Sequence, residues 1–240
     1  MGGEESAERS SNGVDRPVLC YVTDRKAFAG GDSIERMLER VRAAVTAGVD
    51  WVQIREKDLT GRELLELARK VVESANDLAP GAKARVVMNE RLDVALAARA
   101  QGVHLGGGAA PPAEVVRWCR GGNAPADFLV GVSCHSIGEA RAAESAGASY
   151  LFFGPIFDTP SKRSFGPPQG IALLEEVCRA TRIPVVAIGG VDEANASECI
   201  GARAAGIAAI RLFQQRRDAN PLNDAVARLH NLARPIATTR

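Results

Sequence analysis

The chain has 240 residues, of which 46% are hydrophobic and 25% are charged, and its formal net charge is +1. This much apolar sequence can fill one large core or two small ones, and a single α/β barrel fits the length. The near-neutral charge argues against a nucleic-acid-binding protein, because such domains carry a concentrated basic excess that neutralises backbone phosphates. An anionic ligand must therefore be held by a few local groups.

Residues 1–15 are polar and acidic and are expected to form a disordered tail, which leaves a folded domain over residues 16–235. No apolar run reaches 18 residues and the N-terminus is unlike a signal peptide, so we expect a cytoplasmic protein without membrane contacts. The five cysteines form no CxxC pair, which favours free thiols in a reducing compartment. The sequence leaves the oligomeric state open, a homo-oligomer included.

Short β-branched runs alternate with helical patterns rich in Ala, Leu and Glu, which indicates βα units and a parallel sheet. The predicted strands cover residues 18–22, 51–55, 85–88, 103–105, 128–132, 150–153, 185–188 and 207–210. The predicted helices cover residues 34–47, 61–75, 92–98, 112–119, 137–145, 171–180, 194–200 and 221–232. Eight such pairs predict an α/β fold, a single-domain (β/α)8 TIM barrel. A doubly wound open sheet is the alternative, but the first strand lacks a GxGxxG turn.

A weak internal repeat supports the count of eight units. A helix end, a glycine and a strand recur before the second, fourth, sixth and eighth strands, at Gly48, Gly102, Gly147 and Gly206. Each glycine is expected to end its helix in the left-handed conformation. One repeat before every second strand is consistent with a closed barrel of eight βα units.

Ligands of parallel α/β proteins bind beyond the carboxyl ends of the strands, so the residues that follow each strand are the site candidates. The candidates at or just beyond these strand ends are, in chain order, Gln53, Arg55, Glu56, Lys57, Asn89, Glu90, His104, Ser133, His135, Thr159, Ser161, Lys162, Gly189, Gly190 and Arg211. A single charged residue at a strand end is usually only solvated. Arg55, Lys57 and Lys162 at one barrel mouth, however, would repel one another unless an anion such as a pyrophosphate neutralised them.

A second phosphate is expected at two further loops. The loop over residues 154–170 is rich in Gly and Pro and carries the hydroxyls of Thr159 and Ser161 beside Lys162. Gly189-Gly190 ends the seventh strand, where backbone N–H groups can approach a phosphate, although a plain tight turn explains the pair equally well.

Of the three histidines, His135 is the candidate general acid or base, because it follows the fifth strand and imidazole ordinarily titrates near physiological pH. The rival interpretation is that His135 only hydrogen-bonds to the cap of the helix that begins beyond Ser136. His104 is interpreted as an inner-barrel side chain with satisfied hydrogen bonds, and His230 as peripheral.

Together these residues resemble one family, thiamine phosphate synthase and its close relative TenI, a thiazole tautomerase. The matching pieces are Gln53-Ile54-Arg55-Glu56-Lys57, Met88-Asn89-Glu90, Gly102-Val103-His104-Leu105-Gly106, Gly131-Val132-Ser133-Cys134-His135-Ser136, Gly154-Pro155-Ile156-Phe157 with Thr159, Ser161 and Lys162, and Ala187-Ile188-Gly189-Gly190. They occur in family order over residues 17–232, so the set is specific although each piece alone is weak.

The resemblance implies a synthase that joins hydroxymethylpyrimidine pyrophosphate to thiazole phosphate, releasing pyrophosphate and giving thiamine phosphate. Its implied pyrophosphate-binding residues are Arg55, Lys57, Asn89 and Lys162, and its implied thiazole-phosphate-binding residues are Thr159, Ser161 and Gly190. Ser133 would contact the pyrimidine. Gln53, Gly189 and Arg211 complete the expected substrate-binding set, and Lys162, Arg55 and His135 are the expected catalytic residues.

The chain departs from the synthase pattern where two aspartates hold Mg²⁺, since those places hold Glu90 and Ala109. Glu90 still offers a carboxylate and is the predicted Mg²⁺ ligand, whereas Ala109 offers none, so metal binding should be weakened. Arg211 stands where the family usually has a small hydroxyl residue. It could clamp the thiazole phosphate or partly block its pocket.

These departures keep alternatives open. TenI shares the fold and the thiazole-phosphate site, lacks the metal aspartates and uses a histidine at the place of His135, which agrees with Ala109. The intact pair of Arg55 and Lys57 favours the synthase, because that pair would have little to bind without a pyrophosphate. We therefore predict a thiamine phosphate synthase with small phosphorylated substrates, and keep a thiazole tautomerase and a non-catalytic thiazole-phosphate-binding barrel as alternatives.

Overall fold

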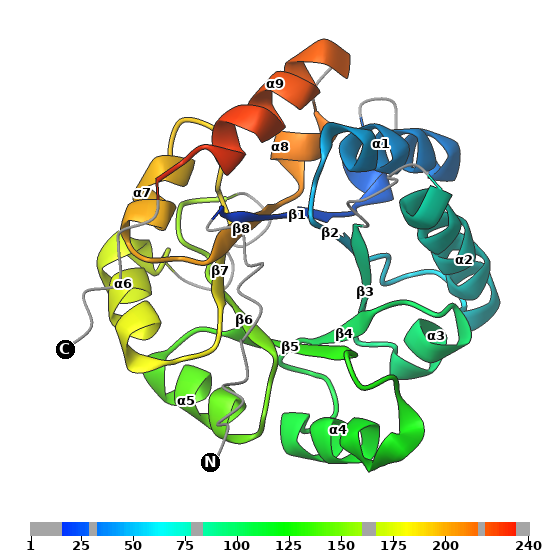
Figure 1. Cartoon of the computed structure of the whole chain (residues 1–240), viewed down its shortest axis with the longest axis horizontal. Coiled ribbons are helices and arrows are strands. Elements are labelled where there is room, and N and C mark those ends of the chain that lie inside the picture. The colour runs from blue at the N-terminus through cyan, green and yellow to red at the C-terminus, as the bar shows by residue number, and fades with distance from the viewer. Residues whose placement is uncertain (1–15, 29–32, 78–83, 160–166, 216–218, 234–240) are drawn as a thin grey trace, which may run out of the picture.

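The computed structural model describes residues 16–28, 33–77, 84–159, 167–215 and 219–233, and of residues 219–221 only the backbone. The predicted tail over residues 1–15 lies outside this description. Eight parallel strands close into a barrel in chain order, with helices around it (Figure 1). Because β1 pairs with β8, the predicted (β/α)8 barrel is confirmed and the open sheet is wrong.

The strands are β1 (Val18–Val22), β2 (Trp51–Ile54), β3 (Arg85–Asn89), β4 (Gly102–Leu105), β5 (Leu129–Cys134), β6 (Tyr150–Phe153), β7 (Val185–Ile188) and β8 (Gly206–Ala209). The helices are α1 (Ile34–Ala47), α2 (Gly61–Asp77), α3 (Leu92–Ala97), α4 (Pro112–Trp118), α5 (Ile137–Ser145), α6 (Gly170–Ala180), α7 (Ala196–Gly201), α8 (Arg211–Gln214) and α9 (Ala219–His230). A 3₁₀ turn, η1 (Arg25–Ala27), and a π-helical turn, η2 (Cys119–Asn123), were not predicted, and neither was α8. None of the helices among the described residues is long and apolar enough to cross a bilayer.

Helix α1 shows why the periodic pattern predicted helices well. Ser33 caps its N-terminus, because the side-chain oxygen accepts a hydrogen bond from the Arg36 N–H at 3.1 Å. Gly48 ends it with a φ of 97°. Met37 and Val41, one turn apart, are both fully buried against the sheet side of the helix.

Two of the four repeat glycines do not end a helix. Gly48 and Gly147 follow α1 and α5 with φ of 97° and 88°, as predicted. Gly102 and Gly206 instead begin β4 and β8, where a Cβ would overlap a carbonyl group of the neighbouring strand. The prediction that these two end helices is wrong, because they are needed for close backbone approach between strands.

Side chains of the barrel alternate between two cores. The larger core lies between the strands and the surrounding helices. The smaller core fills the barrel interior and consists of Cys20, Val22, Tyr150, Phe152, Val186 and Ala208. Each large apolar side chain buried in this way contributes roughly 1.5–3 kcal/mol. The interior is therefore packed, and a ligand must bind at one end of the barrel.

Asp50 closes the amino-terminal end of the barrel. Its Oδ1 lies 2.7 Å from Arg16 Nη2, and its Oδ2 accepts a hydrogen bond from the Leu19 N–H at 2.8 Å. His230 Nε2 lies 3.0 Å from the same Oδ2, so the end of α9 is tied to the start of β2. His230 is thus remote from the strand carboxyl ends, as predicted, but its side chain is only 11% exposed and has a structural role.

Candidate functional site

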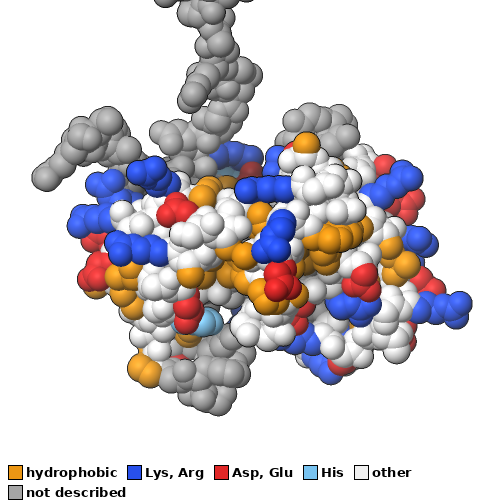
Figure 2. Space-filling view, turned by 90° about the horizontal axis from the view of Figure 1, so that it is seen from below, with side chains coloured by type: hydrophobic (Ala, Val, Ile, Leu, Met, Phe, Trp, Pro, Cys, Tyr) orange, Lys and Arg blue, Asp and Glu red, His pale blue; other side chains and the backbone are white. Residues whose placement is uncertain are grey.

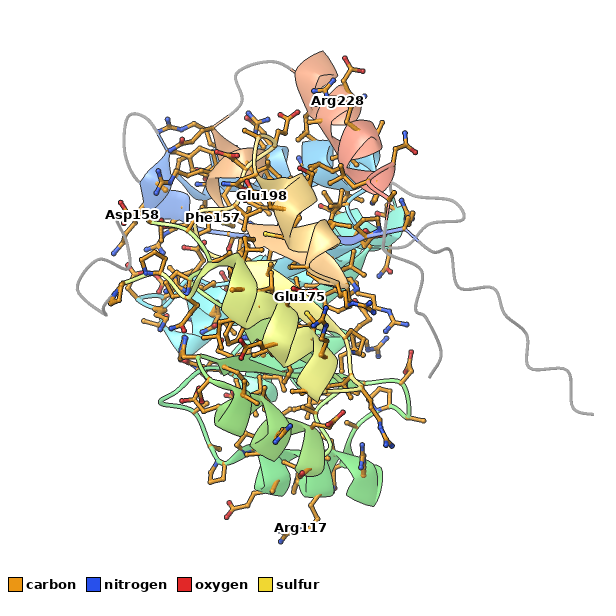
Figure 3. All side chains as sticks on the ribbon, turned by 90° about the vertical axis from the view of Figure 1, so that its left-hand side faces the viewer. Arg117, Phe157, Asp158, Glu175, Glu198 and Arg228 are labelled. Carbon is orange, nitrogen blue, oxygen red and sulfur yellow. The ribbon has the colours of Figure 1, made fainter. Side chains whose placement is uncertain are left out.

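The predicted site residues that the structure describes lie at or just beyond the carboxyl ends of the strands. In side view, Phe157 and Asp158 of the loop after β6 lie at the same end of the molecule as η1, which follows β1 (Figure 3). Ser161 and Lys162 fall outside the described residues, so their roles stay predictions.

The three consecutive residues Arg55, Glu56 and Lys57 have different surroundings. Lys57 is exposed and Arg55 is half-buried, but Glu56 is buried. Its Oε1 accepts a 2.7 Å hydrogen bond from Thr23 Oγ1, and its Oε2 lies 3.0 Å from Arg25 Nη1. Burial raises the pKa of the Glu56 carboxyl, and the hydrogen bonds from Thr23 and Arg25 oppose that rise. Glu56 is therefore a buried anchor, although its neighbours in the sequence, Arg55 and Lys57, are both cations.

Thr23 connects this anchor to Arg55. Its fully buried hydroxyl accepts a hydrogen bond from the Arg55 N–H at 3.0 Å while it donates to Glu56. Arg25, only 5% exposed, also donates from both ends of its guanidinium to Asp58 at 2.7 Å. Arg25 holds the pKa of the Asp58 carboxyl well below its ordinary value. This network holds the main chain from which Arg55 and its neighbour at position 57 project.

A second polar group joins the ends of β2 and β3. The buried Gln53 donates from Nε2 to Asn89 Oδ1 at 3.2 Å, and Lys57 Nζ lies 4.0 Å from Glu90 Oε1. Glu90 has a φ of 63°, which is uncommon for a residue other than glycine. A Cβ on Gly106 would lie 2.6 Å from Glu90 Oε1, so the carboxylate lies against the loop after β4. The structure thus brings four of the predicted residues together.

The carboxylate of Glu90 decides whether this end of the barrel suits Mg²⁺. Among the described residues, no three His, Cys, Asp or Glu side chains cluster as a metal site. Ala109 packs, partly buried, against the larger core and offers no oxygen side chain. Mg²⁺ is commonly held by one or two carboxylates together with substrate phosphates. Glu90 fits such a shared site, in which a phosphorylated ligand supplies other oxygens.

His104 lies inside the barrel below this end, as predicted. It is 2% exposed, and its ring nitrogens lie 3.2 Å from the Tyr150 hydroxyl and 2.8 Å from Ser133 Oγ. Burial lowers the pKa of His104 to about 3, so the imidazole is neutral at physiological pH. Ser133, the predicted pyrimidine contact, is therefore supported from inside the barrel.

The loop after β6 and the turn after β7 form one unit. The Ile156 N–H donates to Ile188 O and the Phe157 N–H donates to Gly189 O, each at 3.0 Å. Gly189 and Gly190 have φ of 93° and 71°. A Cβ on Gly190 would lie 2.8 Å from Phe157 Cβ. Both glycines are required by this close approach. The phosphate-binding role of the pair stays a prediction.

Arg211 extends this unit. It is the first residue of α8, and its Nη2 donates to Thr159 Oγ1 at 3.0 Å. Thr159 is 7% exposed. The arginine that departs from the family pattern thus meets a residue predicted to bind the thiazole phosphate.

His135 contacts the same loop with its ring. Nδ1 lies 2.5 Å from Gly154 O, and because a carbonyl oxygen only accepts, Nδ1 carries a proton and the neutral ring has a lone pair at Nε2. The helix cap is made by other groups, since Ser136 Oγ accepts from the Glu139 N–H at 3.2 Å. The His135 N–H, and not its ring, donates to Glu139 Oε2. The interpretation of the imidazole as a cap partner is therefore wrong.

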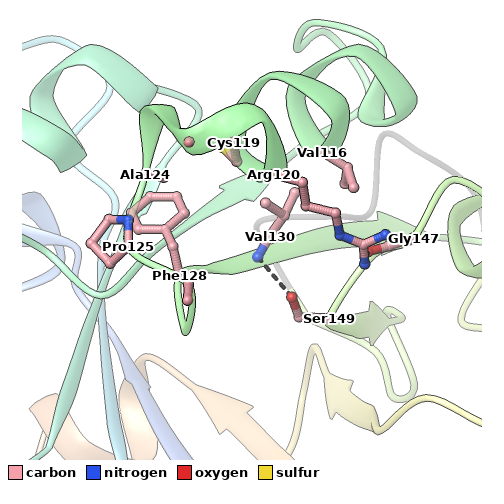
Figure 4. Close-up of a pocket in the computed structure, with 11 residues that line it drawn as sticks. Val116, Cys119, Arg120, Ala124, Pro125, Phe128, Val130, Gly147 and Ser149 are labelled. Carbon is pink, nitrogen blue, oxygen red and sulfur yellow. Dashed lines mark hydrogen bonds between the residues drawn. The ribbon is translucent and has the colours of Figure 1, made fainter.

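A hollow of about 390 Å³ lies at the opposite end of the barrel, before β5 and β6. Figure 2 views the molecule from the side of α4 and α5, where hydrophobic side chains gather near the centre. Phe128 and Pro125 line one part of the hollow, and Ser149 Oγ accepts from the Val130 N–H at 3.0 Å (Figure 4). Arg120 donates to a backbone carbonyl across it. These polar groups serve the fold, and catalytic residues of such barrels lie at the other end.

Sequence reasoning overlooked the residues that support the site from behind. Thr23 and Arg25 follow the first strand without forming a recognisable motif, and Tyr150 is apparent in the sequence only as part of a strand. The position of Thr23 directly after β1 is a signal that could have found it, because that place borders the same barrel end. No local pattern marks Tyr150.

Comparisons with known proteins agree with this geometry. The chain matches the family described as thiamine monophosphate synthase over residues 19–213. It is 42% identical over 190 residues to the thiamine-phosphate synthase of Moorella thermoacetica, covering 79% of this chain and 85% of that protein. It is 40% identical over 213 residues to that of Methanoculleus marisnigri, covering 87% and 95%. Among solved structures, a thiamine phosphate pyrophosphorylase from Pyrococcus furiosus has a TM-score of 0.74 at 26% identity, covering 90% and 96%.

Proposed function

This chain belongs to the thiamine monophosphate synthase family and is an enzyme of thiamine phosphate synthesis, and we propose that it joins hydroxymethylpyrimidine pyrophosphate to thiazole phosphate. The observation that carries the proposal is the presence of two polar regions at one barrel end. One consists of the groups at the ends of β2 and β3, and the other of the joined loops after β6 and β7. Two separate polar regions would suit two phosphorylated substrates.

For this reaction the protein needs only to stabilise the negative charge of the leaving group and to position the two substrates. The bond between the pyrimidine methylene carbon and the pyrophosphate oxygen breaks, and its electron pair leaves with the pyrophosphate. The thiazole nitrogen then donates its electron pair to that carbon. Arg55, Lys57 and Lys162 would stabilise the departing negative charge, and the loops after β6 and β7 would hold the thiazole phosphate in line.

Magnesium is part of the proposal. Glu90 would hold Mg²⁺ together with the pyrophosphate oxygens, and the bound ion would supply further positive charge to the leaving group. Support comes from the position of the Glu90 carboxylate, 4.0 Å from Lys57 Nζ and against the loop after β4.

The test incubates the purified protein with both substrates and Mg²⁺ and measures thiamine phosphate. Lys162→Ala should lower kcat by about 10²–10³, the usual cost of removing one group that stabilises charge in the transition state. Lys70→Ala, at an exposed position of α2, is the matched control and should leave kcat unchanged. Failure of the unmodified enzyme to make thiamine phosphate would sink the proposal.

A second candidate activity, thiazole tautomerisation, is favoured by the geometry of His135. Its Nδ1 donates to Gly154 O, which leaves Nε2 as a base beside the loop after β6. Under this alternative, the enzyme isomerises thiazole carboxylate phosphate and His135→Asn abolishes that activity. Undiminished tautomerisation by the variant would remove His135 from the role.

A further inference from the structure

The three residues Tyr150, His104 and Ser133 form a hydrogen-bonded chain that runs from the barrel interior to its carboxyl end. Tyr150 OH lies 3.2 Å from His104 Nδ1, and His104 Nε2 lies 2.8 Å from Ser133 Oγ. Tyr150 is 1% exposed and His104 is 2% exposed, whereas Ser133 is partly exposed. The His104 ring is also held by Phe152, with ring centroids 4.3 Å apart.

The direction of the first hydrogen bond follows from the burial of Tyr150. A buried phenol proton without an acceptor costs free energy, so it must be donated. Among the described residues, the Tyr150 hydroxyl has one hydrogen-bond partner, His104 Nδ1. Burial raises the pKa of Tyr150 well above its ordinary value, so the phenol keeps its proton. Tyr150 is thus the donor and Nδ1 the acceptor.

The second hydrogen bond then has only one direction. Burial lowers the pKa of His104 to about 3, so the ring carries a single proton. Because Nδ1 accepts, that proton lies on Nε2 and is donated to Ser133 Oγ. The Ser133 hydroxyl proton remains available, and among the described residues this hydroxyl has no second partner.

Gly131 makes the arrangement possible. A Cβ at this position would overlap the Tyr150 ring and hydroxyl, so the phenol passes through the space that a side chain would fill. Gly131 and Ser133 lie two residues apart on β5 and share its inward face. The serine therefore stands directly beyond the buried pair, toward the carboxyl end.

We infer that Tyr150 and His104 hold the Ser133 hydroxyl as a hydrogen-bond donor to the substrate, so that Ser133 selects a group with a free lone pair. With the proposed function as its premise, that group is an unprotonated ring nitrogen of the pyrimidine, and a ring N–H or C–H at the same place is disfavoured. His104 and Tyr150 are positioning residues, and Ser133 determines specificity.

The direction of the two hydrogen bonds that join Tyr150, His104 and Ser133 is tested by ¹⁵N NMR of histidine-labelled full-length protein. The three histidines are assigned with His104→Gln, His135→Gln and His230→Gln. His104 should show the neutral tautomer with the proton on Nε2, unchanged between pH 8 and pH 5. A proton on Nδ1 would overturn the inference. This measurement needs no turnover, so it separates failure of the inference from failure of the proposed function.

The selectivity is tested with two pyridine analogues of the pyrimidine pyrophosphate, each with one ring nitrogen replaced by C–H. One analogue should bind the unmodified enzyme about threefold to tenfold more weakly than the pyrimidine, as expected for one lost hydrogen bond. That difference should disappear in Ser133→Ala and persist in Ser136→Ala, the control on the helix cap. An equal difference in Ser133→Ala would contradict the inference.

Discussion

Thr23 donates a 2.7 Å hydrogen bond to the buried carboxylate of Glu56, 33 residues further along the chain. The same hydroxyl accepts from the Arg55 N–H, so one side chain joins the end of β1 to the cationic segment after β2. Its two hydrogen bonds make Thr23 a support for residues proposed to bind pyrophosphate.

Thr23→Val should therefore both destabilise the fold and impair the enzyme. The variant removes one of the two hydrogen bonds that Glu56 Oε1 accepts and leaves the Arg55 N–H without its partner, which costs about 1–3 kcal/mol of unfolding free energy. Urea denaturation measures this loss, and steady-state kinetics should show a lower kcat/KM for the pyrophosphate substrate. Thr23→Ser keeps the hydroxyl and should remain close to the unmodified protein. Equal behaviour of the two variants would refute the supporting role.

His104 should make the stability depend on pH. Burial lowers its pKa to about 3, while a histidine in the unfolded chain titrates near ~6.5. Between these values the unfolded chain binds more protons, so the unfolding free energy falls as pH falls, by up to ~1.4 kcal/mol per pH unit. Urea denaturation between pH 7 and pH 4 should show a shallower decline in His104→Gln. An equally steep decline in His104→Gln would refute this contribution of His104.

Gly190→Ala should weaken the site after β7. The residue has a φ of 71°, and a Cβ would lie 2.8 Å from Phe157 Cβ, so the loop after β6 must move. We expect a loss of about 1 kcal/mol or more in stability and a higher KM for thiazole phosphate. Gly108→Ala is the control, since a Cβ at that position would meet no heavy atom within 4 Å. A KM unchanged in Gly190→Ala would show that the turn does not shape the site.

Glu90→Gln should raise the Mg²⁺ concentration needed for half-maximal activity, by about tenfold, because a hard cation prefers a carboxylate to an amide. Ala109→Asp should shift it in the opposite direction by adding a second carboxylate. Magnesium titrations of the rate measure both. Asp93→Asn, which removes an exposed carboxylate paired with Arg91, is the control. Identical titrations for Glu90→Gln and the control would exclude Glu90 as a ligand.

Much of the fold was predictable because its signals are local. The strands and helices agree with the predicted ranges to within two residues, since each unit has its own hydrophobic period and turn residues. The short α8 escaped prediction because four residues are too few to show a helical period. Gly102 and Gly206 were misread because a glycine required by a neighbouring strand looks the same in sequence as one that ends a helix.

The amino-acid sequence by itself determined the barrel and the chemical groups at its mouth, because the order of βα units places the residues after each strand at one end. Only the tertiary structure decided which of those groups are anchors and which are free to meet a ligand. The Glu56 carboxylate is hydrogen-bonded to Thr23, and His104 is hydrogen-bonded to Tyr150, which lies 46 residues later in the chain. Barrel closure and the space beside Gly131 bring these partners together. Neither closure nor that space can be deduced from a short segment of the sequence.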